Sequence, residues 1–116
     1  MKLQDMLDIL DEKLSYNFLC APEYPDEDQT NIKKELSEIK SIILKIEPNI
    51  RDDDRNMWLR LIKENIESSE KEFFAGNSVK GRKHLDEAIR YLQNIKLNIK
   101  AKPTFVSGQD GTVEKV

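Results

Sequence analysis

Residues 29–48 decide the fold and read QTNIKKELSEIKSIILKIEP. The apolar residues of this stretch recur every three or four positions, as Ile32, Leu36, Ile39, Ile43 and Ile46. Such spacing places them on one face of an amphipathic helix, while Lys, Glu and Ser fill most other positions. Pro48 ends the pattern, because a proline pushes the residue before it out of the helical region. The stretch therefore predicts a helix with one buried face.

A first helix with the same spacing precedes this stretch. Its apolar line is Leu3, Leu7, Leu10, Leu14 and Phe18. Pro22 and Pro25 stop it, because proline cannot continue a helix interior. Asp26 then fits the N-cap of the following helix, with Gln29 as its reciprocal capping partner. We expect the first helix to be the shortest, and it can either complete a four-helix bundle or lie across a three-helix core.

A third helix is expected to begin between Asn49 and Asp52. The three carboxylates of residues 52–54 then occupy its first turn, where the helix dipole favours negative charge. Its predicted buried line is Trp58, Ile62, Ile66 and Phe73, with Leu59 and Leu61 on the flanks. Asn65 and Ser69 fall within this apolar sector. We therefore expect a hydrogen-bond partner for Asn65 and a close helix crossing at Ser69.

The fourth helix follows a glycine. Gly76 readily takes the left-handed conformation that ends a helix, and Ser78 is expected to cap the next one. The apolar line of this helix is Leu85, Ala88, Ile89, Leu92, Ile95 and Ile99. Pro103 closes it. The line therefore predicts a helix that runs from about Ser78 to shortly before Pro103.

Four amphipathic helices with short connections predict an all-α fold. We expect residues 1–102 to form a single domain, a small antiparallel up-and-down bundle of three to four helices. Residues 103–116 are expected to be a flexible C-terminal tail, with a weak hairpin as the alternative. A bundle of this kind resembles in architecture the small bacterial immunity proteins that act against bacteriocins. The resemblance concerns architecture alone, so it assigns no residue roles.

The charges of the 116-residue chain are unevenly distributed. The net charge is −3, but residues 1–30 carry eight negative and two positive charges, whereas residues 79–102 carry seven positive and two negative. The cations on one flank of the fourth helix are Arg82, Arg90, Lys96 and Lys100. They can pair with a neighbouring acidic first helix, each exposed pair contributing about 0–1 kcal/mol. Alternatively, this flank binds phosphate or nucleic acid, which the acidic total charge disfavours.

Aromatic and acidic residues gather around the first connection. Rigid aromatic side chains are favoured anchors in protein interfaces. The predicted partner-binding residues are Tyr16, Glu23, Tyr24, Asp26 and Glu27. The alternative is that the aromatic rings cover the end of the bundle core. Leu44, Phe74 and Leu97 fall off the apolar lines of their helices, and a second face made of these three would support a homo-oligomer.

The acidic clusters do not match a metal site. Asp52, Asp54 and Asn56 fit the early positions of a calcium-binding loop, but Met57 and Lys63 stand where that loop needs Gly and Glu. A single His and a single Cys are too few for a zinc site. No nucleophile elbow or glycine-rich phosphate loop occurs. We therefore expect no metal, no cofactor and no catalytic activity, and an enzyme that uses acidic side chains is the least favoured alternative.

The predicted function is recognition of another protein, as an adaptor, an inhibitor or an immunity-type factor. The second candidate function is phosphate or nucleic-acid binding along the fourth helix. We expect a cytoplasmic location, because no apolar run approaches the roughly 20 residues of a membrane span. Asp5, Asp8 and Asp11 also interrupt the first stretch that could serve as the apolar part of a secretory signal.

Overall fold

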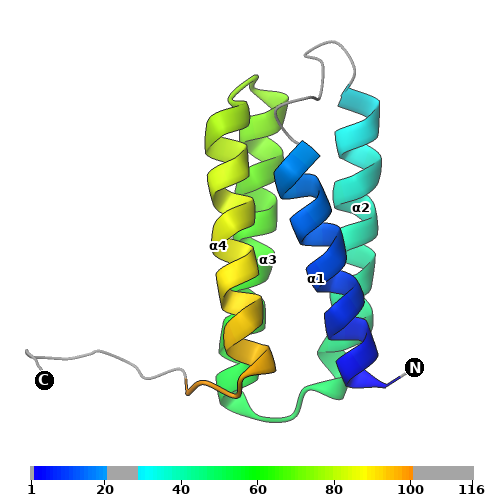
Figure 1. Ribbon diagram of the computed structural model, residues 1–116, viewed down its shortest axis with the longest axis vertical. Coiled ribbons are helices and arrows are strands. Elements are labelled where there is room, and N and C mark those ends of the chain that lie inside the picture. The colour runs from blue at the N-terminus through cyan, green and yellow to red at the C-terminus, as the bar shows by residue number, and fades with distance from the viewer. Residues whose placement is uncertain (1, 21–28, 101–116) are drawn as a thin grey trace, which may run out of the picture.

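The structure is a computed structural model that describes residues 2–20 and 29–100. Its four α-helices are α1 (Leu3–Cys20), α2 (Gln29–Ile46), α3 (Asp53–Phe74) and α4 (Ser78–Lys96), and the short 3-10 helix η2 (Glu47–Asn49) follows α2. Successive helices run in opposite directions, so the chain forms an up-and-down bundle (Figure 1). The predicted all-α antiparallel bundle is confirmed.

Helix α1 completes the bundle as its fourth member. It packs against α2 on one side and α4 on the other, and it is antiparallel to both (Figure 1). Its 18 residues equal the length of α2, and both are shorter than α3 and α4, so α1 shares the shortest length with α2. The alternative arrangement, with the first helix lying across three others, does not occur. Each helix therefore has two neighbours, and α2 and α4 stand at opposite corners.

The apolar lines read from the sequence form one continuous core. In α2 the whole predicted line is buried, and in α1 the three residues Leu7, Leu10 and Leu14 are buried. Met6 and Ile50 also join this core. Fully burying a Leu or Ile side chain stabilises the folded chain by about 1.5–3 kcal/mol. Repeated along four helices, this term drives the assembly of the bundle.

Two aromatic residues of the predicted lines lie at the edge of the core instead. Trp58 is only partly buried, and the neighbouring Leu59 takes the fully buried place. The Trp58 ring stacks on Tyr91 with 5.6 Å between the ring centroids, and its Nε1 donates to the Ile99 carbonyl at 2.8 Å. An indole N–H needs a hydrogen-bond partner, which favours the edge of a core. Phe18 is also partly buried.

A side-chain cap and a left-handed glycine mark the two ends of α3, whereas α4 begins without a side-chain cap. Asp52, expected in the first turn of α3, is instead its N-cap and accepts from the Arg55 backbone N at 3.0 Å, so that Asp53 and Asp54 occupy the first turn. Gly76 takes a φ of 82° after α3, as predicted. Asn77 rather than Ser78 is the N-cap of α4, and its side chain makes no capping hydrogen bond.

Helix α4 ends earlier than expected. It stops at Lys96 because Asn98 adopts a left-handed φ of 57°, which asparagine tolerates better than most residues. The Ile99 backbone N then donates to the Asn94 carbonyl at 2.9 Å. Ile99 therefore lies outside the helix and is exposed, so its predicted place in the buried line was wrong.

The predicted polar positions of α3 are buried to different degrees. Half-buried Asn65 donates through Nδ2 to the Leu61 carbonyl at 2.9 Å, and its Oδ1 lies 3.1 Å from Nδ1 of His84 on α4. The expected partner for Asn65 is thus present. Ser69 is fully buried. The close contact between α3 and α4 lies at Gly81, where a Cβ would stand 2.9 Å from the Phe73 ring.

Within residues 2–20 and 29–100, no helix combines the length and the apolar character that crossing a membrane requires. The predicted Asp26 cap and the predicted tail at residues 103–116 lie outside the described residues.

Candidate binding surface on helices α1 and α4

The seam between α1 and α4 is held by acidic groups of one helix and polar or basic groups of the other. Lys96 Nζ lies 3.0 Å from Asp8 Oδ1 and 3.1 Å from Asp11 Oδ2, and Gln93 Nε2 donates to Asp11 Oδ2 at 3.2 Å. The hydrogen bond from Lys96 lowers the pKa of Asp8, and hydrogen bonds to Asp8 and then Asp11 raise the pKa of Lys96. The acidic first helix therefore pairs with the basic fourth helix inside the bundle.

At the other end of the seam, Arg82 of α4 holds the last turn of α1. Its Nε donates to the Phe18 backbone carbonyl at 2.9 Å, and its guanidinium carbon lies 4.3 Å from the centroid of the Phe18 ring. The last carbonyls of a helix have no partner within that helix, and the last turn of α1 contains no basic residue. Arg82 therefore supplies from α4 the cation that favours a helix C-terminus.

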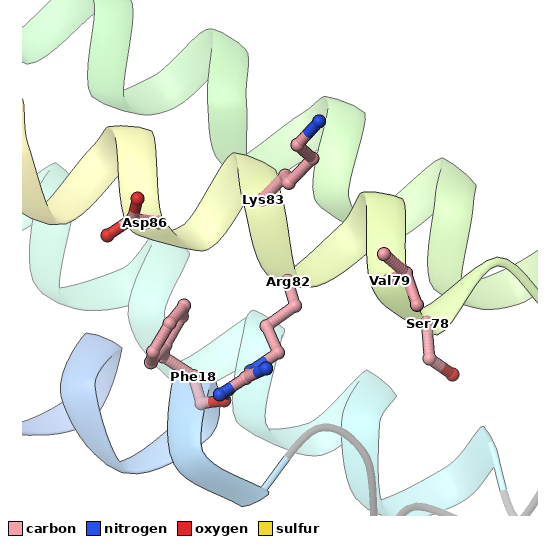
Figure 2. Close-up of a pocket in the computed structure, with 6 residues that line it drawn as sticks. All are labelled: Phe18, Ser78, Val79, Arg82, Lys83 and Asp86. Carbon is pink, nitrogen blue, oxygen red and sulfur yellow. Dashed lines mark hydrogen bonds between the residues drawn. The ribbon is translucent and has the colours of Figure 1, made fainter.

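A pocket of about 390 Å³ opens beside this contact. Its lining residues are Phe18, Ser78, Val79, Arg82, Lys83 and Asp86. Figure 2 shows Arg82 reaching from α4 to the end of α1, with Lys83 pointing away from α1. Phe18 and Val79 supply apolar surface to the pocket. The charged lining residues are the cations Arg82 and Lys83 and the carboxylate Asp86. The pocket therefore suits an apolar side chain that is accompanied by a negative charge.

Exposed apolar side chains lie on the same two helices and in the segment that directly follows α4. Among the described residues, six of the eight large apolar side chains that are exposed lie on α1, on α4 or just after α4. These six are Ile9, Tyr16, Leu19, Val79, Leu97 and Ile99. The other two are Leu44 on α2 and Met57 on α3. We call the outward side of α1 and α4, with the pocket between them, the α1–α4 surface.

Of the predicted partner-binding residues, only Tyr16 lies within the described part of the chain. Its side chain is 57% exposed on α1, so it does not cover the core. Glu23, Tyr24, Asp26 and Glu27 lie outside the described residues, and their predicted role stays a prediction. Sequence reasoning missed Leu19 and Val79. Both stand outside the buried line of their helix, and that position was the available signal.

The four cations of the predicted phosphate-binding strip do not form one row. Arg82 and Lys96 turn toward α1, as described above. Arg90 pairs with Asp86 of the same helix at 3.3 Å, and Lys100 pairs with Asp54 of α3 at 3.4 Å. Each of the four thus has a partner within the bundle. This arrangement favours internal pairing of the acidic and basic helices, and phosphate binding stays a prediction.

The three residues predicted to form a face for a homo-oligomer lie apart. Leu44 is 64% exposed near the end of α2, and Leu97 is 69% exposed just after α4, at the opposite corner of the bundle. Phe74 is partly buried at the end of α3. Because α2 and α3 run in opposite directions, Phe74 and Leu44 are at opposite ends of the molecule (Figure 1). The structure brings no two of them together.

The contact between α1 and α2 contains a buried polar residue that the sequence pattern did not single out. Asn17 is fully buried, and its Nδ2 donates to the Lys13 carbonyl at 2.8 Å and to Glu35 Oε1 at 3.1 Å. Lys13 also pairs with Glu38 of α2, and the hydrogen bond between them lowers the pKa of Glu38. Polar contacts therefore hold α1 to both of its neighbours.

Potential metal ligands do not gather in the described part of the chain, where no group of three His, Cys, Asp or Glu side chains is arranged to hold an ion. Comparison of the chain with protein-family models, with curated proteins and with solved structures gave no significant match.

Proposed function

We propose that the protein acts by binding another protein chain through the α1–α4 surface, without catalysing a reaction. The observation that carries this proposal is that four exposed apolar side chains, Ile9, Tyr16, Leu19 and Val79, lie on α1 and α4, and that Leu97 directly follows α4. Val79 is 78% exposed and Leu19 is 69% exposed. Exposed apolar groups are stabilised when a binding partner removes them from water, so they favour an interaction site on this side of the bundle.

The charges around the pocket define what the partner presents. Arg82 reaches across the pocket to the Phe18 carbonyl, Lys83 lines it while its side chain points away from α1 (Figure 2), and the lining residue Asp86 already pairs with Arg90. An apolar side chain from the partner would rest on Phe18 and Val79, and an acidic group beside it would approach the cations. Such complementarity raises the rate of association and rejects basic partners. An adaptor, an inhibitor and an immunity-type factor all act in this way.

The alternative functions have less support. Phosphate binding by Arg82, Arg90, Lys96 and Lys100 would have to compete with the partners that these cations have within the bundle. A general acid needs a carboxyl whose pKa is raised toward neutrality, whereas ion pairs or hydrogen bonds lower the pKa values of Asp8 and Glu38. These carboxylates are held in their ionised form, which suits a structural role.

The proposal is tested by affinity capture from the native cells with two matched variants. Leu19→Asp combined with Val79→Asp places charges on the α1–α4 surface, and Leu44→Asp places a charge on a similarly exposed residue elsewhere. Circular dichroism first verifies that all chains fold. We expect a defined protein partner to be retained by the wild type and by Leu44→Asp and to be lost from the double variant. Equal retention by all three chains would refute the proposed surface.

A further inference from the structure

We infer that the α1–α4 surface binds a second copy of this chain, in a dimer whose two-fold axis runs parallel to the helices. This inference rests on the proposed protein-binding function and names the partner. It starts from the outward side of α1. Five exposed residues follow one another there at alternating intervals of four and three, as Asp5, Ile9, Glu12, Tyr16 and Leu19. This spacing forms a straight line along a helix, and the line is apolar and acidic.

The outward side of α4 carries the complementary line. It consists of exposed Val79, Lys83 and Arg90, with exposed Leu97 directly after the helix, at intervals of four, seven and seven. Apolar groups occupy both ends of this line, and two cations lie between them. Asp86 stands within it but is only half-exposed and pairs with Arg90. The outward line of α1 in a second copy offers an apolar side chain for the pocket beside Val79 and carboxylates for the cations farther along the line of α4.

Symmetry and charge select one way of joining two copies. Helices α1 and α4 lie side by side and run in opposite directions (Figure 1). A two-fold axis across the helices would stack α1 on α1 and α4 on α4, so like charges would meet. An axis parallel to the helices stacks α1 on α4 of the second copy and α4 on its α1. The second arrangement joins acidic to basic twice, and it closes as a dimer.

The contacts within one chain set the register of this dimer. An axis parallel to the helices leaves each residue at its own level along the bundle. Asp11 Oδ2 lies 3.2 Å from Gln93 Nε2, so the next residue, Glu12, stands within about one helical turn of the level of Arg90. Glu12 of one copy therefore approaches Arg90 of the other.

The same argument places the apolar residues. Phe18 and Arg82 share a level, because the Phe18 carbonyl accepts from Arg82 Nε at 2.9 Å. Leu19 follows Phe18, and Val79 precedes Arg82 by about one turn. Leu19 of the second copy thus stands at the level of Val79 and of the pocket beside it. Each of the two equal contacts combines one pair of opposite charges with one apolar contact.

The test is a charge exchange followed by sedimentation equilibrium on the full chain. In Glu12→Lys alone, and in Arg90→Glu alone, both contacts of the dimer bring like charges together. We expect each variant to weaken self-association by about tenfold or more. An equal mixture of the two variants forms mixed dimers in which both contacts join opposite charges. We expect the mixture to associate as strongly as the wild type.

Three outcomes would overturn the inference. They are a wild type that is monomeric at every concentration, a dimer that is unaffected by both variants, and a mixture that associates no better than each variant alone. Leu44→Asp is the control, and we expect it to leave self-association unchanged. A wild-type monomer that still captures a different protein through Leu19 and Val79 would refute the second copy as the partner while leaving the proposed function intact.

Discussion

Gly81 has no room for a side chain. A methyl group at this position would lie 2.9 Å from three atoms of the Phe73 ring, nearer than carbon atoms pack without a shift. Phe73 is itself buried in α3, so the ring cannot simply turn toward solvent. The glycine therefore permits the close approach of α3 and α4, a role that no pattern along the sequence reveals.

We expect Gly81→Ala to lower the free energy of unfolding by about 1 kcal/mol. Crowding in a packed core lowers stability by about 1–3 kcal/mol, whereas replacing glycine by alanine in a helix raises stability by up to about 1 kcal/mol. Urea unfolding measures the difference. In a background that carries Phe73→Leu, Gly81→Ala should no longer cause the part of its destabilisation that is due to crowding. Lys80→Ala on the exposed side of α4 serves as the control. An alanine variant more stable than the wild type would show that the contact is not tight.

Arg82 is the residue that fixes the end of α1. We expect Arg82→Ala to cost about 1–2 kcal/mol of stability, because it removes a hydrogen bond to a helix end and a cation resting on an aromatic ring. The matched control is Arg60→Ala on the exposed side of α3, with an expected change within about 0.5 kcal/mol. Chemical unfolding of both variants checks this, and equal losses would contradict the role given to Arg82.

Among the elements, α1 depends most on polar contacts. Asp8 and Asp11 hold it to α4, and Lys13 and Asn17 hold it to α2. The periodicity of α1 predicted that it is a helix and which residues are buried, because that information is local. It did not predict Asn17, which continues the buried line with a polar side chain. The partner that makes this burial possible, Glu35, comes from another helix.

Lowering the pH should therefore weaken the attachment of α1 to α2 and α4. Ion pairing lowers the pKa values of Asp8 and Glu38 from ordinary values of 3.8 and 4.5. Their pairs stabilise the folded chain above these ordinary values, and the stabilisation is lost as pH falls through the lower pKa values of the folded state. We expect Asp8→Asn with Glu38→Gln to reduce the decline in stability between about pH 5 and pH 2, measured by urea unfolding at each pH.

The control for this experiment is Glu67→Gln, a change at an exposed carboxylate on α3. The free energy of unfolding of this variant should fall with decreasing pH as much as that of the wild type. If the double variant also declines like the wild type, the ion pairs of α1 do not govern the acid response.

The boundaries of elements were less predictable than their existence. The sequence indicated the stop of α3 at Gly76 correctly and placed its start slightly too early, since α3 begins at Asp53 after the N-cap Asp52. It placed the end of α4 near Pro103, whereas Asn98 ends the helix by adopting a left-handed conformation. Leu59 rather than Trp58 is buried in the core, because the Trp58 indole lies at the core edge, where its Nε1 donates to the Ile99 carbonyl. Both differences depend on contacts or conformations that helical spacing does not contain.

At the scale of the whole molecule, the uneven charge distribution favours the pairing of α1 with α4. The acidic first helix and the basic fourth helix are neighbours, and Lys96 joins them. The sequence therefore allowed the pairing of helices to be predicted. It could not show which side chains stay exposed once the bundle forms. Leu19 and Val79 became candidates only when the positions of α1 and α4 were known.

The most direct test of the central claim is photo-cross-linking from single positions on the folded chain. A photoreactive amino acid replaces Val79 in one protein and Leu44 in another, and mass spectrometry identifies the attached peptide. We expect position 79 to form a covalent adduct with a protein chain, and position 44 to form none. Adducts of equal yield from both positions, or none from position 79, would contradict the assignment of the α1–α4 surface as the binding site.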